Sequence, residues 1–340
     1  MAGIPVVALA ACSSGGSSGG VATGPAPEQS TIVLDAVPTA DAAGIYLAQD
    51  NGYFKQQGLT VKIMPINGGE YGMGDLQTGK AQLIEGNYVS FILAQIAGTF
   101  AAPNPANPAQ TEPAKPINMR LIANTSQMQA GNQALYVLPS SPYKTVQDLV
   151  RHHVAVGVNT LHNIGSVFLG SLLASDGYRV SALRQSPQIL PLMPMLLAQH
   201  KISAAWLPEP FGTEAQQQFG AVQLADFNQG SLQNFPIGTI AGNASWVQSH
   251  PNTVAAFLRA YNEGQQVADT NRAAVEAALV KHVPQLTKEI AATMTLDTYP
   301  LAMDVPVMQR VSDAMYQFGV IAKPYRIATM LQQEPGMIDG

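Results

Sequence analysis

Polar side chains follow several short apolar runs of this chain, and their types suit the capture of a small molecule. They stand where predicted strands end, beside two adjacent glycines that would let backbone approach a ligand. In open α/β sheets, ligands bind outside the carboxyl ends of the strands. The predicted ligand-binding residues are Thr39, Asp41, Asn67, Gly68, Glu70, Asn87, Tyr88, Thr125, Ser126, Thr160, His162, Asn163, Arg184, Trp206 and Glu209.

The charges and donors of these loops rank the possible ligands. Helices that begin after Asp41, Asn87 and Asn163 would aim free N–H groups inward, where an anionic or acceptor group can sit. Arg184 is the one base expected at a strand's carboxyl end, and it could pair with an anion. Acids and aromatic rings outnumber this single base, and they are Asp41, Glu70, Glu85, Glu209, Tyr46, Tyr71, Tyr88 and Trp206. This balance favours a neutral or nitrogen-rich organic molecule over nitrate or bicarbonate, and the helix-start donors leave a sulfonate open.

For each residue taken alone, an ordinary structural role is the simpler interpretation. Asp and Asn commonly cap helices, and His162 could be a polar loop residue without a ligand. Glu209 has no acid or base partner in sequence, and the chain has neither Cys/His metal spacing nor a phosphate-binding P-loop. We therefore expect a binding protein that is not an enzyme and that uses no metal and no cofactor.

Cys12 is the only cysteine, and it stands where a short apolar run gives way to a Ser/Gly tract. The run is too short to span a bilayer, which takes about 20 residues, and it fits the apolar part of a secretory signal. Leu9-Ala10-Ala11-Cys12 resembles a bacterial lipobox, although no Lys or Arg precedes Lys55, which a truncated start would explain. The sequence predicts a signal segment over 1–12, lipidation of Cys12 and a flexible linker over 13–30. The alternative is a disordered tail whose cysteine is accidental.

The remaining chain alternates short strands and helices, which is typical of parallel sheets covered by helices. Residues 100–116, rich in Pro, Ala and Asn, predict a surface excursion. The predicted strands are 31–35, 59–66, 81–85, 119–124, 134–138, 153–158, 178–184, 202–207, 221–227 and 237–241. The predicted helices are 42–50, 70–78, 88–97, 145–150, 164–175, 188–199, 209–219, 253–269, 271–282, 287–298 and 304–320.

This order predicts two α/β lobes, with the C-terminal helices returning to cover the first. One lobe would hold residues 31–135 and 240–340, and the other residues 136–239. Two crossing segments, near 132–138 and 235–243, would form the hinge. A chain that is 46% apolar can bury a large core, while a net charge of −5 with 11% charged residues offers no basic field for nucleic acid.

Three neighbouring segments, Ala42-Ala43-Gly44-Ile45-Tyr46-Leu47-Ala48, Asn51-Gly52-Tyr53-Phe54 and Gly58-Leu59-Thr60-Val61, resemble the opening of one family. It comprises substrate-binding proteins of ABC importers, in the nitrate/sulfonate/taurine and thiamine-pyrimidine-precursor (NMT1/THI5-like) group. Further matches follow in the family's order at 76–86, 145–157, 201–210 and 246–261. Members that resemble the pyrimidine-precursor binders carry His where this chain has Ala42.

The resemblance implies a two-lobe periplasmic-binding-protein fold of type II, an α/β fold with mixed sheets flanked by helices and a hinge between the lobes. It implies an extracytoplasmic, lipid-anchored monomer that delivers a small nitrogen- or sulfur-containing organic solute to a membrane permease. The solute would be sulfonate- or taurine-like, or a pyrimidine or other aromatic. The alternatives are an enzyme on the same fold, similar to menaquinone- or thiamine-pathway proteins, and a signalling or adhesion surface lipoprotein.

Overall fold

The structure is a computed structural model of the 340-residue chain. It describes residues 24–96, 101–104, 107–113, 116–284 and 286–331. Cys12, the predicted signal segment and the first part of the predicted linker lie outside these residues. Within the described ranges, no helix combines the length and the apolar character that crossing a membrane requires.

The first sheet has five strands in the order β2-β1-β3-β12-β6. β1 pairs in parallel with β2 and β3, whereas β12 is antiparallel to β3 and to β6. The strands are β1 (Thr31–Ala36), β2 (Thr60–Pro65), β3 (Leu83–Asn87), β6 (Met119–Gln127) and β12 (Pro236–Asn243). The register runs from Thr31 opposite Thr60 to Ala36 opposite Pro65, so β1 and β2 end at one edge of the sheet.

The second sheet has the order β11-β7-β10-β8-β9. β8 is parallel to β9 and β10, while β7 is antiparallel to β10 and β11. The strands are β7 (Gln133–Val137), β8 (Ala155–Val158), β9 (Arg184–Pro187), β10 (Ala204–Pro208) and β11 (Val222–Asp226). Every residue of β10 is buried, as expected for a strand with helices on both faces. The mixed α/β fold with two helix-flanked sheets confirms the predicted fold class.

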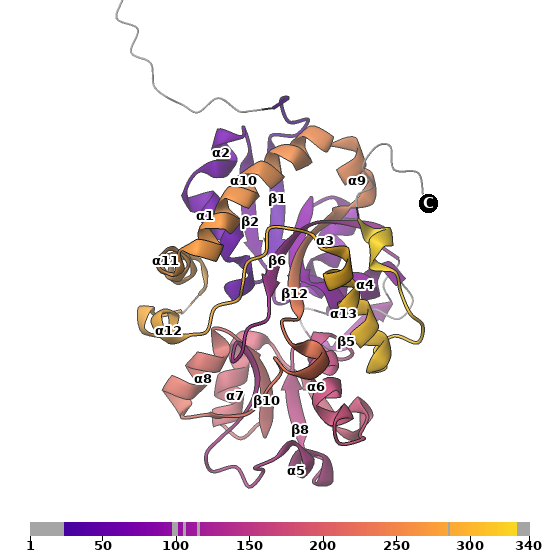
Figure 1. Cartoon of the computed structure of the whole chain (residues 1–340), viewed down its shortest axis with the longest axis vertical. Helices are drawn as coiled ribbons and strands as arrows, with labels where there is room; N and C mark the ends of the chain where they lie inside the picture. The colour runs from indigo at the N-terminus through magenta and orange to yellow at the C-terminus, as the bar shows by residue number, and fades with distance from the viewer. Residues whose placement is uncertain (1–23, 97–100, 105–106, 114–115, 285, 332–340) are drawn as a thin grey trace, which may run out of the picture.

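Helices cover both sheets (Figure 1). In the first, α1, α10 and α11 lie on one face, and α3, α4 and α13 on the other. α1 approaches α10 closely because Gly44 and Gly264 meet, and a Cβ on Gly264 would lie 2.3 Å from the Gly44 carbonyl oxygen. The helices are α1 (Ala43–Asp50), α2 (Tyr53–Gln56), α3 (Met73–Thr78), α4 (Tyr88–Ile96), α5 (Val146–Arg151), α6 (Ile164–Ala174), α7 (Met193–Ala198), α8 (Phe211–Phe219), α9 (Ala244–Ser249), α10 (Pro251–Thr270), α11 (Arg272–His282), α12 (Lys288–Thr293) and α13 (Val305–Gln317), with short 3₁₀ helices η1 (Ala40–Ala42), η2 (Gly69–Gly72), η3 (Val180–Ala182), η4 (Leu190–Leu192), η5 (Gly230–Leu232) and η6 (Ile327–Met330).

Two segments, 128–132 and 227–235, connect the two sheets. They lie side by side, because the Met128 N–H donates to the Phe235 carbonyl at 2.8 Å and Gln127 Nε2 donates to the Asn234 carbonyl at 2.7 Å. Arg310 of α13 also donates to the Gln233 carbonyl, at 2.6 Å. The predicted lobe boundaries, after residues 135 and 239, fall inside β7 and β12.

Strand pairing or hydrogen bonds also occur in two segments outside the predicted strands and helices. Part of the predicted excursion over 100–116 forms an antiparallel pair, β4 (Ala101–Asn104) and β5 (Asn107–Pro113). The last residues of the predicted flexible linker are fixed in place. The Glu28 carboxylate accepts hydrogen bonds from the backbone N–H groups of Asn252 and Thr253 at the start of α10, at 3.0 and 2.8 Å. Trp246 of α9 donates to Gln29 at 3.0 Å.

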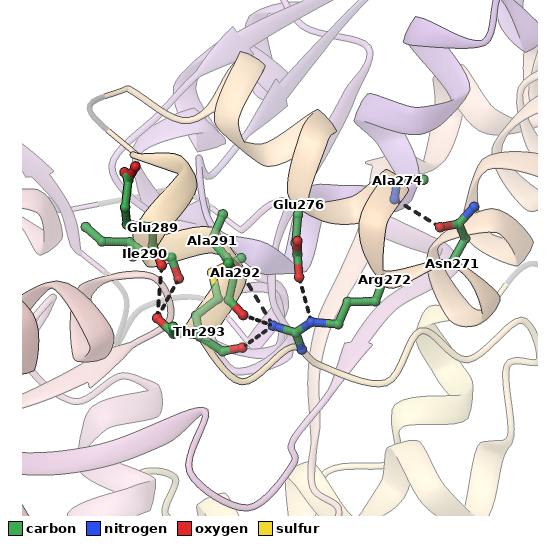
Figure 2. A network of polar contacts seen from close by, with 10 residues as sticks. Asn271, Arg272, Ala274, Glu276, Glu289, Ile290, Ala291, Ala292 and Thr293 are labelled. Atoms are coloured by element: carbon green, nitrogen blue, oxygen red, sulfur yellow. Dashed lines mark hydrogen bonds and ion pairs between the residues drawn. The ribbon is translucent and has the colours of Figure 1, made fainter.

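Arg272 connects α11 to α12 (Figure 2). Its Nε donates to Glu276 at 2.6 Å, and its Nη2 donates to the carbonyls of Ala291, Ala292 and Met294 at 3.4, 3.3 and 2.8 Å. These carbonyls end α12 and lack partners within the helix, so the guanidinium satisfies them. α12 in turn contacts α8 beside the second sheet, where Gln217 donates to Thr293 at 2.6 Å.

Candidate functional site: a cavity between the two sheets

A small cavity of about 40 Å³, partly open to solvent, lies between the two sheets. From the first sheet and its loops it is lined by Val37, Thr39, Asp41, Gly68, Glu85, Gly86, Asn87, Ile237 and Gly238. From the second sheet and its loops it is lined by Gln133, Asn159, Ile164, Leu190, Trp206 and Pro208. Most of these residues end a parallel strand or follow one, where ligands bind in open α/β folds.

Two carboxyl groups form the first-sheet wall of the cavity. Asp41 accepts hydrogen bonds from the hydroxyls of Thr39, at 2.7 Å, and of Ser126. Glu85 accepts from the Val37 N–H at 3.0 Å. Burial raises the pKa of Asp41, and burial together with the negative charge of Asp41 raises the pKa of Glu85 well above its usual range.

The acidic character extends behind this wall. The buried Asp297 accepts a hydrogen bond from Asn132 Nδ2. Burial, and then the negative charges of Asp41, Glu209 and Glu85, raise the pKa of Asp297 well above its usual range. None of the residues that line the cavity is Lys or Arg. The region therefore concentrates acidic side chains.

The second-sheet wall is mainly apolar. Trp206 donates from Nε1 to Gln133 Oε1 at 2.9 Å, and its ring meets Phe168 edge-on with centroids 5.7 Å apart. Ile164 and Leu190 complete this surface. Asn159 is only 4% exposed, and its Oδ1 has no hydrogen-bond partner among the described residues. This wall thus offers apolar contact and one free acceptor.

Glu70 connects the two walls beside the cavity. Its side chain is fully buried and accepts from Ser90 at 3.0 Å on its own side. From the loop that follows β8 of the second sheet, it accepts hydrogen bonds from the Thr160 hydroxyl, from Asn159 Nδ2 at 3.4 Å and from Asn163 Nδ2 at 3.5 Å. Burial raises the pKa of Glu70, while the hydrogen bonds from Thr160 and Ser90 lower it. Donors from both halves thus converge on one carboxyl group.

The structure brings nine of the fifteen predicted residues together. Five of them line the cavity, namely Thr39, Asp41, Gly68, Asn87 and Trp206. Four more bond to Asp41 or belong to the Glu70 network, namely Glu70, Ser126, Thr160 and Asn163. Asn87 also accepts from the Ser90 N–H at 2.9 Å and so caps the start of α4.

Arg184 does not join them. The predicted strand 178–184 begins only at Arg184, since residues 180–182 form η3 instead. Arg184 therefore stands opposite Ala155 at the amino end of β9, where it is exposed. Its expected place at a carboxyl end was wrong, and the anion partner it was to supply is absent from the cavity lining.

The other five predicted residues do not line the cavity. Asn67 and His162 are exposed, and His162 has a φ of +57° in the loop after β8. Tyr88 is fully buried and donates to Asn124, while Thr125 is buried in β6, so neither lines the cavity. Glu209 accepts from the Thr213 N–H at 3.0 Å and hydroxyl at 2.7 Å, so it caps α8.

Sequence reasoning missed several lining residues. Glu85 lines the cavity from within β3, two residues before the strand ends, whereas the sequence predicts ligand contacts only from the residues that follow. Gln133 and Gly238 lie on antiparallel strands, to which the rule for parallel strand ends does not apply. The Asn159 position, directly after β8, was the available signal for that residue.

The model of the NMT1-like family matches residues 25–282. The chain belongs to this family. No curated protein sequence matches it. The NMT1-like chain is similar in fold to the alkanesulfonate-binding protein SsuA from Xanthomonas axonopodis pv. citri bound to MOPS, with a TM-score of 0.72 and 14% identity over 90% of this chain and 99% of that one.

Two further solved structures share the fold. The periplasmic nitrate-binding protein NrtA from Synechocystis PCC 6803 has a TM-score of 0.74 and 16% identity, covering 90% of this chain and 85% of that one. The Candida albicans CA3427 gene product has a TM-score of 0.69 and 13% identity, covering 91% and 98%, and is described as having the generic periplasmic binding protein fold. The NMT1-like chain therefore has the periplasmic binding protein fold.

Proposed function

We propose that this protein is the solute-binding component of an ABC importer and captures a small organic solute between its two sheets. The observation that supports this function most is that residues from both sheets line one cavity at the strands' carboxyl ends, with Glu70 joining the two walls beside it. The family and the fold support this function, because SsuA and NrtA are named as alkanesulfonate- and nitrate-binding proteins. The cavity binds the solute without changing any of its bonds.

The proposal includes the rest of the transport arrangement. Two lobes, 31–135 with 240–340 and 136–239, close by a hinge on the solute, and the closed form docks on a membrane permease. The protein is extracytoplasmic and held at the membrane by a lipid on Cys12. The solute contains nitrogen or sulfur, as a sulfonate- or taurine-like compound or as a pyrimidine or other aromatic.

A thermal-shift screen over sulfonates, pyrimidines, amines and aromatic acids tests the binding function. A ligand that binds only the folded state raises Tm with its concentration. Trp206→Ala and Asn87→Ala should reduce that shift, because both side chains line the cavity. Asn252→Ala, on α10 away from the cavity, is the matched control. Unchanged shifts in both cavity variants would place binding elsewhere, and recovery of a chemically altered solute would indicate an enzyme.

Cys12→Ser tests the anchor separately. The thiol is the acyl acceptor in the proposed lipidation, so the change should abolish incorporation of a labelled fatty acid and retention in the membrane fraction. The matched control is Ser13→Ala, which leaves the thiol in place. Equal labelling of the Cys12→Ser protein would refute the anchor and leave the solute-binding proposal standing.

A further inference from the structure

We infer that the cavity takes a small organic cation, whose protonated amine or amidine lies between Asp41 and Glu85 and whose apolar body lies against the second-sheet wall. The inference rests on the proposed function and deepens it by naming the class of solute. A cavity for a cation differs from a cavity that binds a sulfonate or nitrate anion, although the SsuA and NrtA structures are similar in fold to this chain.

The polar lining favours a ligand that donates hydrogen bonds. Asp41 and Glu85 supply carboxyl oxygens, and Asn159 Oδ1 is a buried acceptor without a partner among the described residues. The lining includes no Lys or Arg. A ligand anion beside an ionised carboxylate would be repelled, because charges interact strongly where water is largely excluded. A cation at the same place would be attracted.

The apolar wall favours an organic cation over a metal ion. No group of His, Cys, Asp or Glu within the described ranges has the arrangement to hold a metal. Ile164, Leu190 and Trp206 instead present hydrocarbon and an aromatic ring opposite the acids. An aromatic ring near a cation adds attraction of its own.

The buried acids around the cavity support this assignment. Burial and mutual repulsion raise the pKa values of Glu85 and Asp297, and no Lys or Arg counters the repulsion at either group. A buried charge without an opposite charge is costly. A cationic ligand would supply the missing opposite charge, and it would do so only when the cavity is filled.

The test compares benzene derivatives of similar shape and different charge. Benzylamine and benzamidine are the cations, benzyl alcohol is the neutral analogue and benzenesulfonate is the anion, and nitrate is added because NrtA is named as a nitrate-binding protein. Binding to the full chain is measured by isothermal titration calorimetry and by thermal shift. We expect at least one cation to bind at least about 10-fold more tightly than benzyl alcohol and benzenesulfonate.

Variants connect the preference to the two acids. Asp41→Asn and Glu85→Gln should each weaken binding of the cation by at least about 10-fold, because each removes a buried charge partner. Asp269→Asn and Glu263→Gln make the same changes on the exposed side of α10 and should leave the affinity unaltered. Having two acid variants keeps the test usable if one fails to fold, which circular dichroism would show.

The outcomes distinguish this inference from the proposed function. Tight binding of benzenesulfonate or nitrate without binding of a cation would overturn the cation assignment and leave the solute-binding function standing. Binding of a cation with unchanged affinity in both acid variants would also overturn it. If no member of the panel binds and none raises Tm, the proposed function fails and this inference fails with it.

Discussion

Asp35 illustrates how a single buried charge shapes the stability of this fold. It lies in β1, is 1% exposed, and its Oδ2 has no hydrogen-bond partner among the described residues. A Cβ on Gly72 would lie 3.1 Å from that oxygen, so η2 closes over the carboxyl group. Burial, and then the charge of Asp75, raise its pKa to about 6, while Lys80 opposes the shift.

Asp35→Asn should stabilise the protein near neutral pH. The folded-state pKa of Asp35, about 6, is above the ordinary value of 3.8, so the folded state binds the proton more tightly than the unfolded state. The free energy of unfolding therefore falls as pH rises from 3.8 to about 6. Removing the charge should recover on the order of 1 to 3 kcal/mol at pH 7 and flatten this pH dependence.

Urea unfolding across this pH range provides the measurement. Asp313→Asn, an exposed acid of α13, is the matched control and should change little. If Asp35→Asn has a lower free energy of unfolding than the parent protein at pH 7, the Asp35 carboxylate makes a net stabilising interaction.

The individual site residues could be predicted where one simple rule governs them. Thr39, Gly68 and Asn87 lie in the cavity because they end or follow parallel strands. Glu209 obeyed the same rule in sequence, yet its carboxylate caps α8. Sequence alone does not distinguish a capping side chain from a ligand contact, because both roles select the same residue types at the same positions.

At the level of elements, α12 depends on a residue outside it. It has six residues, too few to be stable alone, and its final carbonyls are satisfied by Arg272 of α11 (Figure 2). The sequence predicted helices at 271–282 and 287–298, and the second ends at Thr293 in the structure. The shorter extent could not be predicted, because the Arg272 contacts depend on the tertiary arrangement.

Arg272→Ala should loosen α12 without unfolding the chain. The change removes the donor to three helix-end carbonyls and the ion pair with Glu276, so we expect a loss of about 1 kcal/mol in the free energy of unfolding. Hydrogen exchange of the α12 amides should increase. Arg326→Ala is the control, since its exposed side chain makes no hydrogen bond within the described ranges. Equal exchange in both variants would show that packing alone fixes α12.

The prediction of a strand over 178–184 was wrong for a different reason. Residues 178–182 alternate in polarity as a strand would, but 180–182 turn as η3 and the strand begins only at Arg184. Because β9 begins at Arg184 and does not end there, Arg184 lies at the amino end of the strand and not at the predicted carboxyl end. The position of a short edge strand is set by its pairing with β8, which the local sequence does not encode.

At the level of the whole molecule, the Glu70 network holds the two halves together. Glu70 and Ser90 belong to elements beside the first sheet, and Thr160 and Asn163 to the loop that follows β8. The network is buried, and it is separate from the two segments that connect the sheets covalently. It is therefore suited to stabilise the closed arrangement.

Thr160→Val should shift the protein toward a more open form. Valine keeps the volume but removes the hydroxyl that donates to Glu70, leaving a buried carboxylate short of a donor, at a cost of about 1 to 3 kcal/mol. The radius of gyration from small-angle scattering should rise and ligand affinity should fall. Thr160→Ser retains the hydroxyl and should behave like the parent protein. Identical scattering from both variants would show that Glu70 does not control closure.

The position of β12 has a consequence for how the chain reaches its native state. β12 stands between β3 and β6, yet it is made only after all of β7 to β11. During synthesis, the first sheet lacks the strand between β3 and β6 until β12 has been made. The strands of the second sheet are consecutive in the sequence, so that sheet can fold first. We expect pulse-labelling during refolding to protect amides of β8 and β10 before those of β3, and the late insertion of one central strand to set the pace.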